Sequence, residues 1–419
     1  MATAAAPTPM AIIRSVKQQV GYSPPQEGLL ELLEDFRLMV NDCIRMGLEK
    51  EEQEGIVITS MRKLSLTCYH QLAAYDLPAY YRLTAISRAA GILRNYRREK
   101  KGNPNTKRPY AERHVLTDCY GFRIFGRLLR IPFRRKREYI FIILNDHTMK
   151  MLSGRDVRSI TLSPDSLSIS YSRDVVQIQP QGAIGIDRNL DNITTADTIG
   201  SIRRYGSLVQ ATRIKAKIRQ IKIRFTRNDT RIRKKVHSKY GTLQRNRVNH
   251  VLSNVSSRIV KRAQKNKLAI IIEDIKGIRK LYRKGNGQGK NYRAVLNSWS
   301  YYELQRQIAY KARWEGLPVI YVPARGTSAG CSICGSKTIP NESRTLYCPN
   351  CKVSFDRDEN AARNILAKRC GGLGMPVEIP IPMRFEPNCS AGEAMVTERE
   401  GTTLIRPVDG GKITREVSA

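Results

Sequence analysis

Four cysteines in the C-terminal half of the chain are spaced as the ligands of a metal ion. Cys331 and Cys334 form one CxxC pair, and Cys348 and Cys351 form a second pair after thirteen intervening residues. Each CxxC pair makes a turn that brings its two thiolates together, and two such turns provide tetrahedral coordination for zinc. Because four thiolates complete that coordination, we expect one structural zinc ion rather than a catalytic one. Four unrelated buried cysteines and a redox-active dithiol are the alternative interpretations.

The remaining cysteines indicate the cellular compartment in which the protein folds. The chain has nine cysteines in all, and the five outside the two pairs are scattered along the sequence. A secreted disulfide-rich protein would have an even number at regular spacings. The pattern therefore favours a reducing cytoplasm.

Three acidic residues lie where a carboxylate is costly to bury. Asp187 ends the apolar run AIGID, Glu273 ends the run AIIIE, and Asp358 lies in FDRDENAARNI at the start of an expected helix. A buried carboxylate needs a cation or a hydrogen-bonding partner, and three brought together would repel one another unless metal ions lay between them. Oxygen ligands suit Mg²⁺ or Mn²⁺ rather than zinc. Two such ions would activate water and stabilise the leaving oxygen of a phosphodiester.

Each of these acids also has an ordinary structural interpretation. Aspartate is common in turns, so Asp187 could simply end its strand. Glu273 is followed by Asp274, and the pleat of a strand points the two side chains to opposite faces, so either could be the ligand. Asp358 could cap the helix that follows it, and Asp356 is close by. The acids are therefore convincing only as a set.

Apolar patterning predicts an α/β arrangement from Gly182 onward, with the first two acids at strand ends. Buried strands are expected from AIGIDRNL, KLAIIIEDI and LPVIYVP, which are apolar with little alternation. Helical spacing marks one helix with Ile214 and Phe225 on its core face and a second over residues 243–264. A third helix is expected over YYELQRQIAYKARWEG, with Gly316 as its C-cap.

The first 180 residues show a different organisation. Alternating apolar residues predict a strand over 10–20, and helical spacing predicts three helices, over 26–50, 58–74 and 78–98. A small helical domain is therefore expected over residues 20–115. Short β-branched and aromatic segments between residues 121 and 180 predict an antiparallel sheet or small barrel. The strand at 10–20 could join that sheet, which would make the helices an insertion.

The charge of the chain indicates a polyanionic partner. It has 73 Lys and Arg against 37 Asp and Glu, a net charge of +36, and nucleic acid is the usual partner of so basic a protein. The 41% apolar content excludes a disordered tail protein, and no apolar run is long enough to span a membrane. Residues 372–419 lack periodicity and are expected to form a mostly flexible tail.

Three segments carry most of the basic surplus. Residues 201–250 contain 16 Lys and Arg and a single acid, as expected of a face that follows a phosphate backbone. Residues 276–295 contain seven basic residues and no acid, and could be a mobile lid over the metal site or a disordered surface loop. Residues 91–140 interleave 15 Lys and Arg with aromatic residues that either stack on unpaired bases or belong to the core, namely Tyr96, Tyr110, Tyr120, Phe122 and Phe125.

The order and context of these motifs resemble those of one family. The sequence is similar to the transposon-encoded RNA-guided nucleases called TnpB and to their relatives, the compact type V CRISPR effectors. The resemblance rests on GIDRNLDNITT, IIIEDIKGIR, LNSWSYYELQRQIAYKARWEG, PARGTSAGCSICG, and CPNC followed by FDRDENAARNIL, which cover about residues 182–370 in the family's order. The first 180 residues match only in outline.

This resemblance implies an α+β multidomain protein that contains a RuvC-like nuclease domain of RNase H fold with an inserted zinc ribbon. It assigns the catalytic acids of the family's three motifs to Asp187, Glu273 and Asp358, as ligands of two Mg²⁺ (or Mn²⁺) ions, and the zinc ligands to the four paired cysteines. The implied domains are a barrel-like wedge at 1–20 and 121–180, a helical recognition domain at 21–120, the nuclease at 181–325 and 355–371, the ribbon at 326–354 and the tail at 372–419.

The function that follows from the resemblance is RNA-guided DNA cleavage. A guide RNA would direct the protein to target DNA, double-stranded and single-stranded, beside a short motif, with base pairing reading the sequence and the protein holding an A-form heteroduplex. The alternatives are an unguided transposase or resolvase that uses the same acids, and a catalytically silent RNA-guided repressor. A prokaryotic, cytoplasmic, nucleoid-associated location is expected, with no membrane partner and with either one or two copies of the chain on the RNA.

Overall fold

The computed structural model describes residues 10–20, 27–55, 57–58, 60–135, 138–275, 278, 287 and 289–370. The predicted flexible tail at 372–419 lies outside the described residues, as does most of the predicted lid at 276–295. In the described part of the chain, no helix is both long and apolar enough to cross a membrane.

The N-terminal strand belongs to a sheet whose other strands come more than a hundred residues later. Strands β1 (Met10–Gln19), β2 (Leu116–Asp118), β6 (Asp156–Leu162) and β7 (Ser166–Val175) form an antiparallel sheet in the order β1-β7-β6-β2. β1 pairs with β7 along its whole length, from Met10 opposite Val175 to Gln19 opposite Ser166. The prediction that the strand at 10–20 joins this sheet is confirmed, and the helices between β1 and β2 are an insertion.

The inserted helices pack around one apolar core. They are α1 (Glu27–Glu54), α2 (Met61–Cys68), the short 3-10 helix η1 (Gln71–Ala74) and α3 (Ala79–Gly102). The single helix predicted over 58–74 is wrong, because the chain breaks into α2 and η1. Leu64, Cys68 and Leu72 are nonetheless all buried in the same core, so their spacing could not reveal the break.

The remaining antiparallel strands form a second, separate sheet rather than extending the first. β3 (Arg123–Phe125), β4 (Leu128–Pro132) and β5 (Tyr139–Ile143) pair in the order β3-β4-β5. A helix that was not predicted, α4 (Asp146–Leu152), follows β5, and the side chain of Asn145 caps it by accepting a hydrogen bond from the Thr148 backbone N–H at 2.8 Å. The antiparallel strands expected between residues 121 and 180 are confirmed.

The C-terminal half is built on a mixed sheet in the order β10-β9-β8-β11-β12. β8 (Gly182–Arg188), β11 (Leu268–Asp274) and β12 (Val319–Pro323) are parallel to one another. β9 (Ile193–Asp197) and β10 (Ile202–Tyr205), which were not predicted, run antiparallel at one edge. Every residue of β8 is buried, which explains its continuous apolar run.

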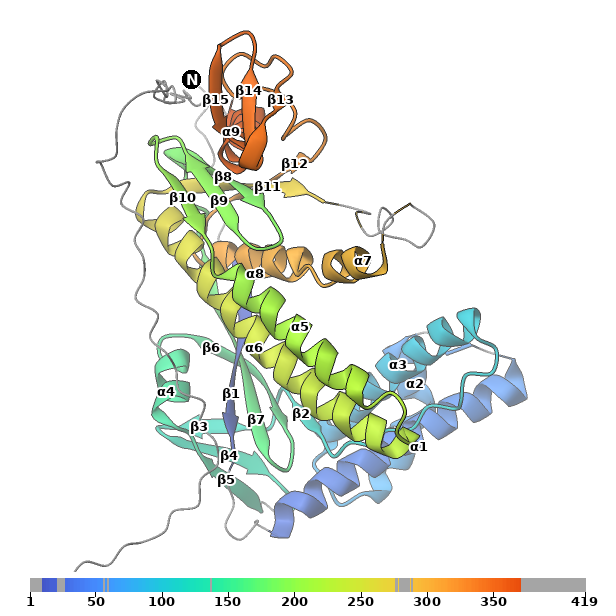
Figure 1. Cartoon of the computed structure of the whole chain (residues 1–419). Helices are drawn as coiled ribbons and strands as arrows, with labels where there is room; N and C mark the ends of the chain where they lie inside the picture. Colours follow the sequence, from blue (N-terminus) through green and yellow to red (C-terminus); the bar gives the residue numbers. More distant parts are fainter. Residues whose placement is uncertain are drawn as a thin grey trace, which may run out of the picture.

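Helices cover both faces of this sheet. Alternate residues of β8 and β11, such as Ile184 and Ile270, pack against α5 (Leu208–Arg224), α6 (Thr230–Lys265) and α8 (Tyr301–Trp314). The other set, such as Ala183 and Ala269, packs against α9 (Arg357–Cys370). Gly185 allows α9 to come close, because a Cβ atom there would lie 2.5 Å from the backbone oxygen of Ala362. Figure 1 shows α9 on one side of the sheet and α8 on the other.

Helices α5 and α6 form a long hairpin that leads away from the sheet (Figure 1). The predicted helix over 243–264 starts too late, since α6 begins at Thr230. Its first half is basic and mostly exposed, and its apolar stripe is narrow, with Ile232, Val236 and Tyr240 set among basic residues. Asp229 starts the helix instead, with its side chain accepting from the Ile232 N–H at 2.9 Å.

A small three-stranded unit lies between β12 and α9. Strands β13 (Ile339–Pro340), β14 (Thr345–Cys348) and β15 (Val353–Asp356) pair in that order, with the 3-10 helix η3 (Glu342–Arg344) between the first two. One CxxC pair precedes β13, and the other lies at the end of β14 and in the turn between β14 and β15. Helix α7 (Lys290–Asn297) precedes α8 and contains the end of the segment for which a lid was predicted.

Candidate active site and metal centre

The three candidate acids lie at one edge of the parallel strands. Asp187 and Glu273 are the next-to-last residues of β8 and β11, and their preceding neighbours Ile186 and Ile272 are paired in parallel register. Asp358 is the second residue of α9, which packs on the adjoining face. The residues are 8%, 7% and 3% exposed, respectively. The fold therefore brings together acids that are separated by up to 171 positions in the sequence.

The carboxyl groups lie near enough to repel one another electrostatically. Burial, which is the largest cause, and the nearby carboxylates of Glu273 and Asp358 together raise the pKa of Asp187 to about 7, against a hydrogen bond from Asn189 that lowers it. A carboxylate so disfavoured in its charged form gains by binding a cation. The arrangement thus has the charge and the oxygen-only donor set that suit Mg²⁺ or Mn²⁺.

Two asparagines in the turn after β8 orient the first and third acids. Asn189 donates from Nδ2 to Oδ2 of Asp187 at 2.7 Å, and Asn192 donates from Nδ2 to Oδ2 of Asp358 at 3.4 Å. Asn189 also donates to Oδ1 of Asn192 at 3.3 Å. Sequence reasoning missed both residues, although RNLDN directly after Asp187 was a visible polar signal.

Glu273 is held by a hydroxyl group and by a buried arginine. Thr327 donates its hydroxyl to Oε1 of Glu273. Arg188 is 2% exposed and donates to the backbone oxygen of Glu273, and it also donates to Oε1 of Gln305 at 2.7 Å. The alternative ligand Asp274 is only half-buried, so Glu273 is the better-enclosed acid of the pair. Arg188 and Thr327 were not identified from sequence.

Asp358 forms an ion pair with Arg344, which lies in η3 between β13 and β14. Nη2 of Arg344 lies 2.6 Å from Oδ1 of Asp358. Arg344 has φ +67°, a left-handed conformation that is uncommon for residues other than glycine. Asp356 caps α9, because its Oδ1 accepts from the backbone N–H of Asp358 at 2.8 Å and of Glu359 at 3.1 Å. The side chain of Asp358 is therefore not needed as the cap.

The four cysteine sulfurs converge with the spacing of a tetrahedral zinc site. All four Sγ atoms lie within 4.8 Å of one another, with Cys331 to Cys351 at 3.9 Å and Cys334 to Cys348 at 3.5 Å. Zinc–sulfur bonds of about 2.3 Å at tetrahedral angles place sulfurs about 3.8 Å apart. The residues present thus fit zinc, with four thiolates and no open position.

The two CxxC turns have the same backbone geometry. The residue after each pair has a positive φ, +77° at Gly335 and +57° at Lys352. The N–H of Gly335 donates to the oxygen of Cys331 at 2.9 Å, and the N–H of Lys352 donates to that of Cys348 at 2.8 Å. This repeated turn is what directs each pair of sulfurs to one side.

The cysteine unit is tied to the helix that carries the third acid. Asn360 of α9 donates to the backbone oxygen of Gly330 at 2.8 Å and accepts from the N–H of Ser332 at 2.8 Å. Asn364, one turn later, donates to the same Gly330 oxygen at 2.8 Å. A metal bound by the cysteines would therefore stiffen a unit that is bonded directly to α9.

The aromatic residues of the basic segment at 91–140 divide into two groups. Tyr110, Tyr120 and Phe125 are 59%, 70% and 52% exposed, whereas Tyr96 and Phe122 pack against the core. The exposed group is available for stacking, and the other belongs to the core. The core interpretation is confirmed for Tyr96 and Phe122, and stacking by the exposed residues stays a prediction.

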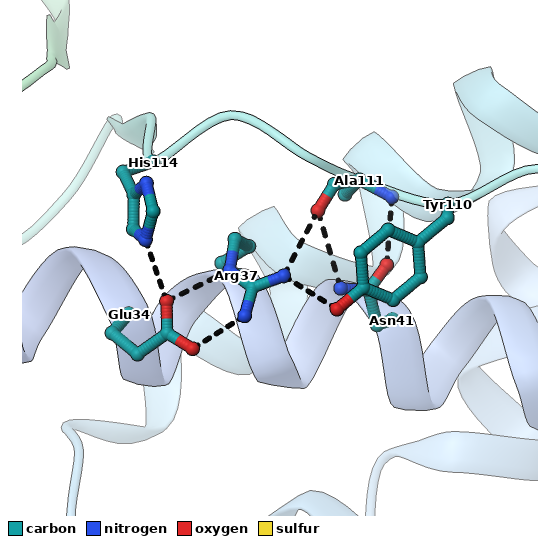
Figure 2. A network of polar contacts seen from close by, with 6 residues as sticks. All are labelled: Glu34, Arg37, Asn41, Tyr110, Ala111 and His114. Atoms are coloured by element: carbon teal, nitrogen blue, oxygen red, sulfur yellow. Dashed lines mark hydrogen bonds and ion pairs between the residues drawn. The ribbon is translucent and has the colours of Figure 1, made fainter.

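Tyr110 is fixed in place by a polar network on α1, shown in Figure 2. Arg37 donates to the hydroxyl of Tyr110 at 2.6 Å and forms an ion pair with Glu34, which also contacts His114 at 2.7 Å. Oδ1 of Asn41 accepts a hydrogen bond from the backbone N–H of Ala111, the residue after Tyr110, at 2.7 Å. The network holds the segment between α3 and β2 against the helix.

Comparison with known proteins gives consistent matches. Residues 301–365 match the family model described as Cas12f1-like, TNB domain. A TnpB-like protein of Methanocaldococcus jannaschii is 30% identical over 250 residues, which are 56% of this chain and 87% of that protein. The Escherichia coli protein InsQ, to which RNA-guided DNA endonuclease activity is ascribed, is 28% identical over 258 residues, which are 55% of this chain and 62% of InsQ.

The fold is also similar to that of a compact Cas12 effector. Cas12f1, in a structure of its complex with sgRNA and target DNA, matches with a TM-score of 0.57 at 17% identity. The match covers 81% of this chain and 83% of that chain. The mixed α/β architecture described above is therefore shared over most of both chains.

Proposed function

The chain belongs to the TnpB-like protein family, and on this basis we propose that it is an RNA-guided DNA endonuclease. A guide RNA pairs with target DNA beside a short motif, and the protein cuts the DNA by metal-dependent hydrolysis of a phosphodiester. The observation that carries the proposal is the convergence of the buried carboxylates of Asp187, Glu273 and Asp358 at one edge of a parallel sheet. Such a cluster is costly without cations.

The proposal includes the domain assignment implied by the sequence resemblance. Residues 181–325 and 355–371 form the RuvC-like, RNase H-type nuclease domain, and residues 326–354 form the zinc ribbon. Residues 1–20 and 121–180 form the wedge, and residues 21–120 form the recognition domain. The sheet order and the helices on both faces support the first assignment, and the pairing of β1 with β7 supports treating the wedge as one unit.

The chain's own residues prepare the site for cleavage. Two Mg²⁺ or Mn²⁺ ions, when bound by the three acids, supply an activated water and stabilise the leaving oxygen. Asn189 and Asn192 orient two of the carboxylates through hydrogen bonds. Thr327 holds the third carboxylate, that of Glu273, in the same way. Because Asp187 and Glu273 are held by fixed partners, they need little reorganisation when cations bind, whereas Asp358 must also give up its ion pair with Arg344.

The zinc ribbon has a structural part in this proposal. Its four thiolates leave no position for a substrate, and its hydrogen bonds to Asn360 and Asn364 attach it to α9 beside Asp358. The basic first half of α6, which is mostly exposed, provides a surface for the nucleic acid backbone. One or two copies of the chain on the RNA are both compatible with this arrangement.

The deciding experiment compares purified wild-type protein with the variants Asp187→Ala and Asp191→Ala. Asp191 is exposed in the same turn and serves as the control. We expect wild type and the control to cut a target plasmid with Mg²⁺ present, and Asp187→Ala to bind the target through its RNA without cutting. Cleavage by Asp187→Ala would overturn the assignment of the acids.

Two further measurements separate the remaining functions. Sequencing of the RNA that copurifies with the protein should give one discrete species, and RNase treatment should abolish cleavage. An unguided transposase or resolvase would keep its activity after RNase treatment. A silent repressor would bind target DNA through its RNA but leave it uncut in the wild-type form.

A further inference from the structure

The pairing between the strands that carry Asp187 and Glu273 ends just before these two acids. In the described structure, β8 and β11 are paired in parallel register as far as Ile186 opposite Ile272, which is one residue short of either acid. Each strand continues further on its other side, where β8 pairs with β9 and β11 pairs with β12. The pairing therefore fixes each acid relative to an outer strand but leaves the separation of the two acids to other contacts.

The side chain of Arg188 bridges the two strands beyond that point. Arg188 follows Asp187 as the last residue of β8, and its guanidinium donates a hydrogen bond to the backbone oxygen of Glu273. Side chains alternate along a strand, so Arg188 lies with Ile186 on the face covered by α8, and the two acids lie on the face covered by α9. Arg188 thus joins the ends of both strands from behind the acids.

The same guanidinium also binds the start of helix α8. It donates to the backbone oxygen of Tyr301 at 3.2 Å and to Oε1 of Gln305 at 2.7 Å. Just before the helix, Nε1 of Trp299 donates to the backbone oxygen of Asn189 at 2.9 Å, and the side chain of Asn189 donates to the carboxylate of Asp187. The start of α8 is therefore bonded to the ends of both strands that carry an acid.

Arg188 is an unusual residue to bury at this position. It is 2% exposed, and its Nε has no hydrogen-bond partner among the described residues. Burial lowers the pKa of Arg188 to about 10, so the side chain keeps its charge at neutral pH. A buried cation is costly unless hydrogen bonds compensate it. The planar fork of donors that arginine has, and lysine lacks, allows one side chain to bind acceptors on both β11 and α8.

We propose that Arg188 is a positioning residue that fixes the separation of the Asp187 and Glu273 carboxylates and thereby sets the affinity of the site for divalent cations. The inference rests on the proposed function, in which these acids bind Mg²⁺ or Mn²⁺. A cation held by carboxylates from two strands needs the strand ends at a fixed separation. Groups that orient metal ligands from behind contribute strongly to metal affinity.

Positioning and charge predict opposite results when Arg188 is replaced. A positive charge close to a cation site repels the cation, so a role through charge alone means that Arg188→Gln binds Mn²⁺ more tightly than wild type. Tighter binding is the result expected for Arg344→Gln, because Arg344 pairs directly with the carboxylate of Asp358. A positioning role means that Arg188→Gln binds Mn²⁺ more weakly. The sign of the change therefore separates the two roles.

The test is calorimetric titration of Mn²⁺ into the full-length chain after removal of copurified RNA, which also binds divalent cations. Replacing a group that orients metal ligands typically costs a factor of about 10–100 in affinity. We therefore expect Arg188→Gln to bind Mn²⁺ about tenfold or more weakly than wild type, at a temperature where circular dichroism shows both to be folded. Asp187→Ala identifies the part of the Mn²⁺ binding that belongs to the acids.

Arg173→Gln is the matched control. Arg173 also joins a strand to α8, but at the other end of the helix, where it donates to the backbone oxygen of Trp314 and pairs with Glu315 at 3.5 Å. Its replacement removes the same charge and a similar link without affecting the strand ends, so the Mn²⁺ affinity should stay that of wild type.

Gln305→Ala keeps the inference testable if Arg188→Gln does not fold. This change removes one acceptor of the Arg188 guanidinium, at a half-buried position. It removes no charge, so a change in Mn²⁺ affinity reports on position alone. We expect weaker Mn²⁺ binding, by a smaller factor than in Arg188→Gln, because two of the three acceptors remain.

Two results would overturn the inference. One is Mn²⁺ binding by folded Arg188→Gln that is as tight as in wild type or tighter, or, where that variant does not fold, unchanged binding by Gln305→Ala. The other is an equal loss of affinity in Arg173→Gln, which would make the effect one of general stability. If wild type binds Mn²⁺ no better than Asp187→Ala, the cation site of the proposed function fails too, and this outcome differs from failure of the inference alone.

Discussion

Replacing Asp187 with asparagine should stabilise the protein when divalent cations are absent. The folded protein holds a proton on Asp187 more tightly than the unfolded chain does, because burial and the neighbouring acids raise its pKa from 3.8 to about 7. The penalty for ionising this group is absent below pH 3.8, grows as the pH rises towards 7 and is complete above that. Asparagine has no charge to bury and still accepts the hydrogen bond from Asn189.

The magnitude follows from the pKa shift. A shift of about three units at 1.36 kcal/mol per unit corresponds to about 4 kcal/mol at pH 8 as an upper bound, and to about 2 kcal/mol at pH 5. For a unit the size of residues 182–370, 1 kcal/mol moves the midpoint of thermal unfolding by about 2–4 °C. We therefore expect Asp187→Asn to unfold up to about 8–16 °C higher than wild type at pH 8 in EDTA, and to lose about half of this advantage at pH 5.

The assay is thermal unfolding by differential scanning fluorimetry at both pH values, in EDTA and in Mg²⁺. Cation binding should raise the midpoint of wild type but not that of Asp187→Asn, and the control Asp191→Asn should behave as wild type. The reasoning is refuted if Asp187→Asn is no more stable than wild type at pH 8 in EDTA. Equal stabilisation of both proteins by Mg²⁺ would refute the assignment of Asp187 as a cation ligand.

Three further predictions test the surroundings of the site. Cys348→Ser should remove the single zinc ion per chain in elemental analysis, whereas Cys119→Ser, at an exposed cysteine, should retain it; zinc retained in both would exclude the four-thiolate site. Gly185→Ala should lower the free energy of unfolding by about 1–3 kcal/mol, because its Cβ would meet a backbone oxygen of α9 at 2.5 Å. Gly91→Ala, in open space on α3, should raise it by up to about 1 kcal/mol in denaturant titrations; the same sign for both would contradict the packing argument. Arg344→Gln should increase Mn²⁺ affinity severalfold by calorimetry, because it frees the carboxylate at the start of α9 from an ion pair, and weaker Mn²⁺ binding would be evidence against such competition.

Much of the fold could be predicted because its elements have local patterns. The buried runs that became β8 and β11 are apolar on both faces, since helices cover both sides of the sheet. The early start of α6 was missed because basic residues dominate its mostly exposed first half, although Ile232, Val236 and Tyr240 have helical spacing. The break between α2 and η1 was hidden for the opposite reason, because both pieces keep their apolar residues on one core.

The candidate site was likewise predictable in part: the sequence indicated the acids and cysteines but not the contacts between them and distant segments. An acid at the end of an apolar run, or a cysteine three positions from another, is visible within a few residues, so Asp187, Glu273 and the paired cysteines could be noted directly. Asp358 lies at a helix start, and the three acids were convincing only as a set. Their chemistry depends on contacts between distant segments, such as Thr327 with Glu273. Nothing in the local sequence marks that threonine, because its role comes from the packing of the segment after β12 against β11.

The sequence by itself therefore determined the ligand types, the basic charge and the strands that carry the first two acids, since each depends on residue identity and short-range spacing. The tertiary structure alone decided that the acids lie at the same edge of the sheet, that Arg344 reaches Asp358, and that Phe125 and Phe141 are exposed while Phe122 packs against the core. These outcomes depend on strand register and on which faces are covered. The register of the strands, and which faces of a sheet are covered by other elements, are set by the packing of the whole chain, which the local sequence pattern does not encode.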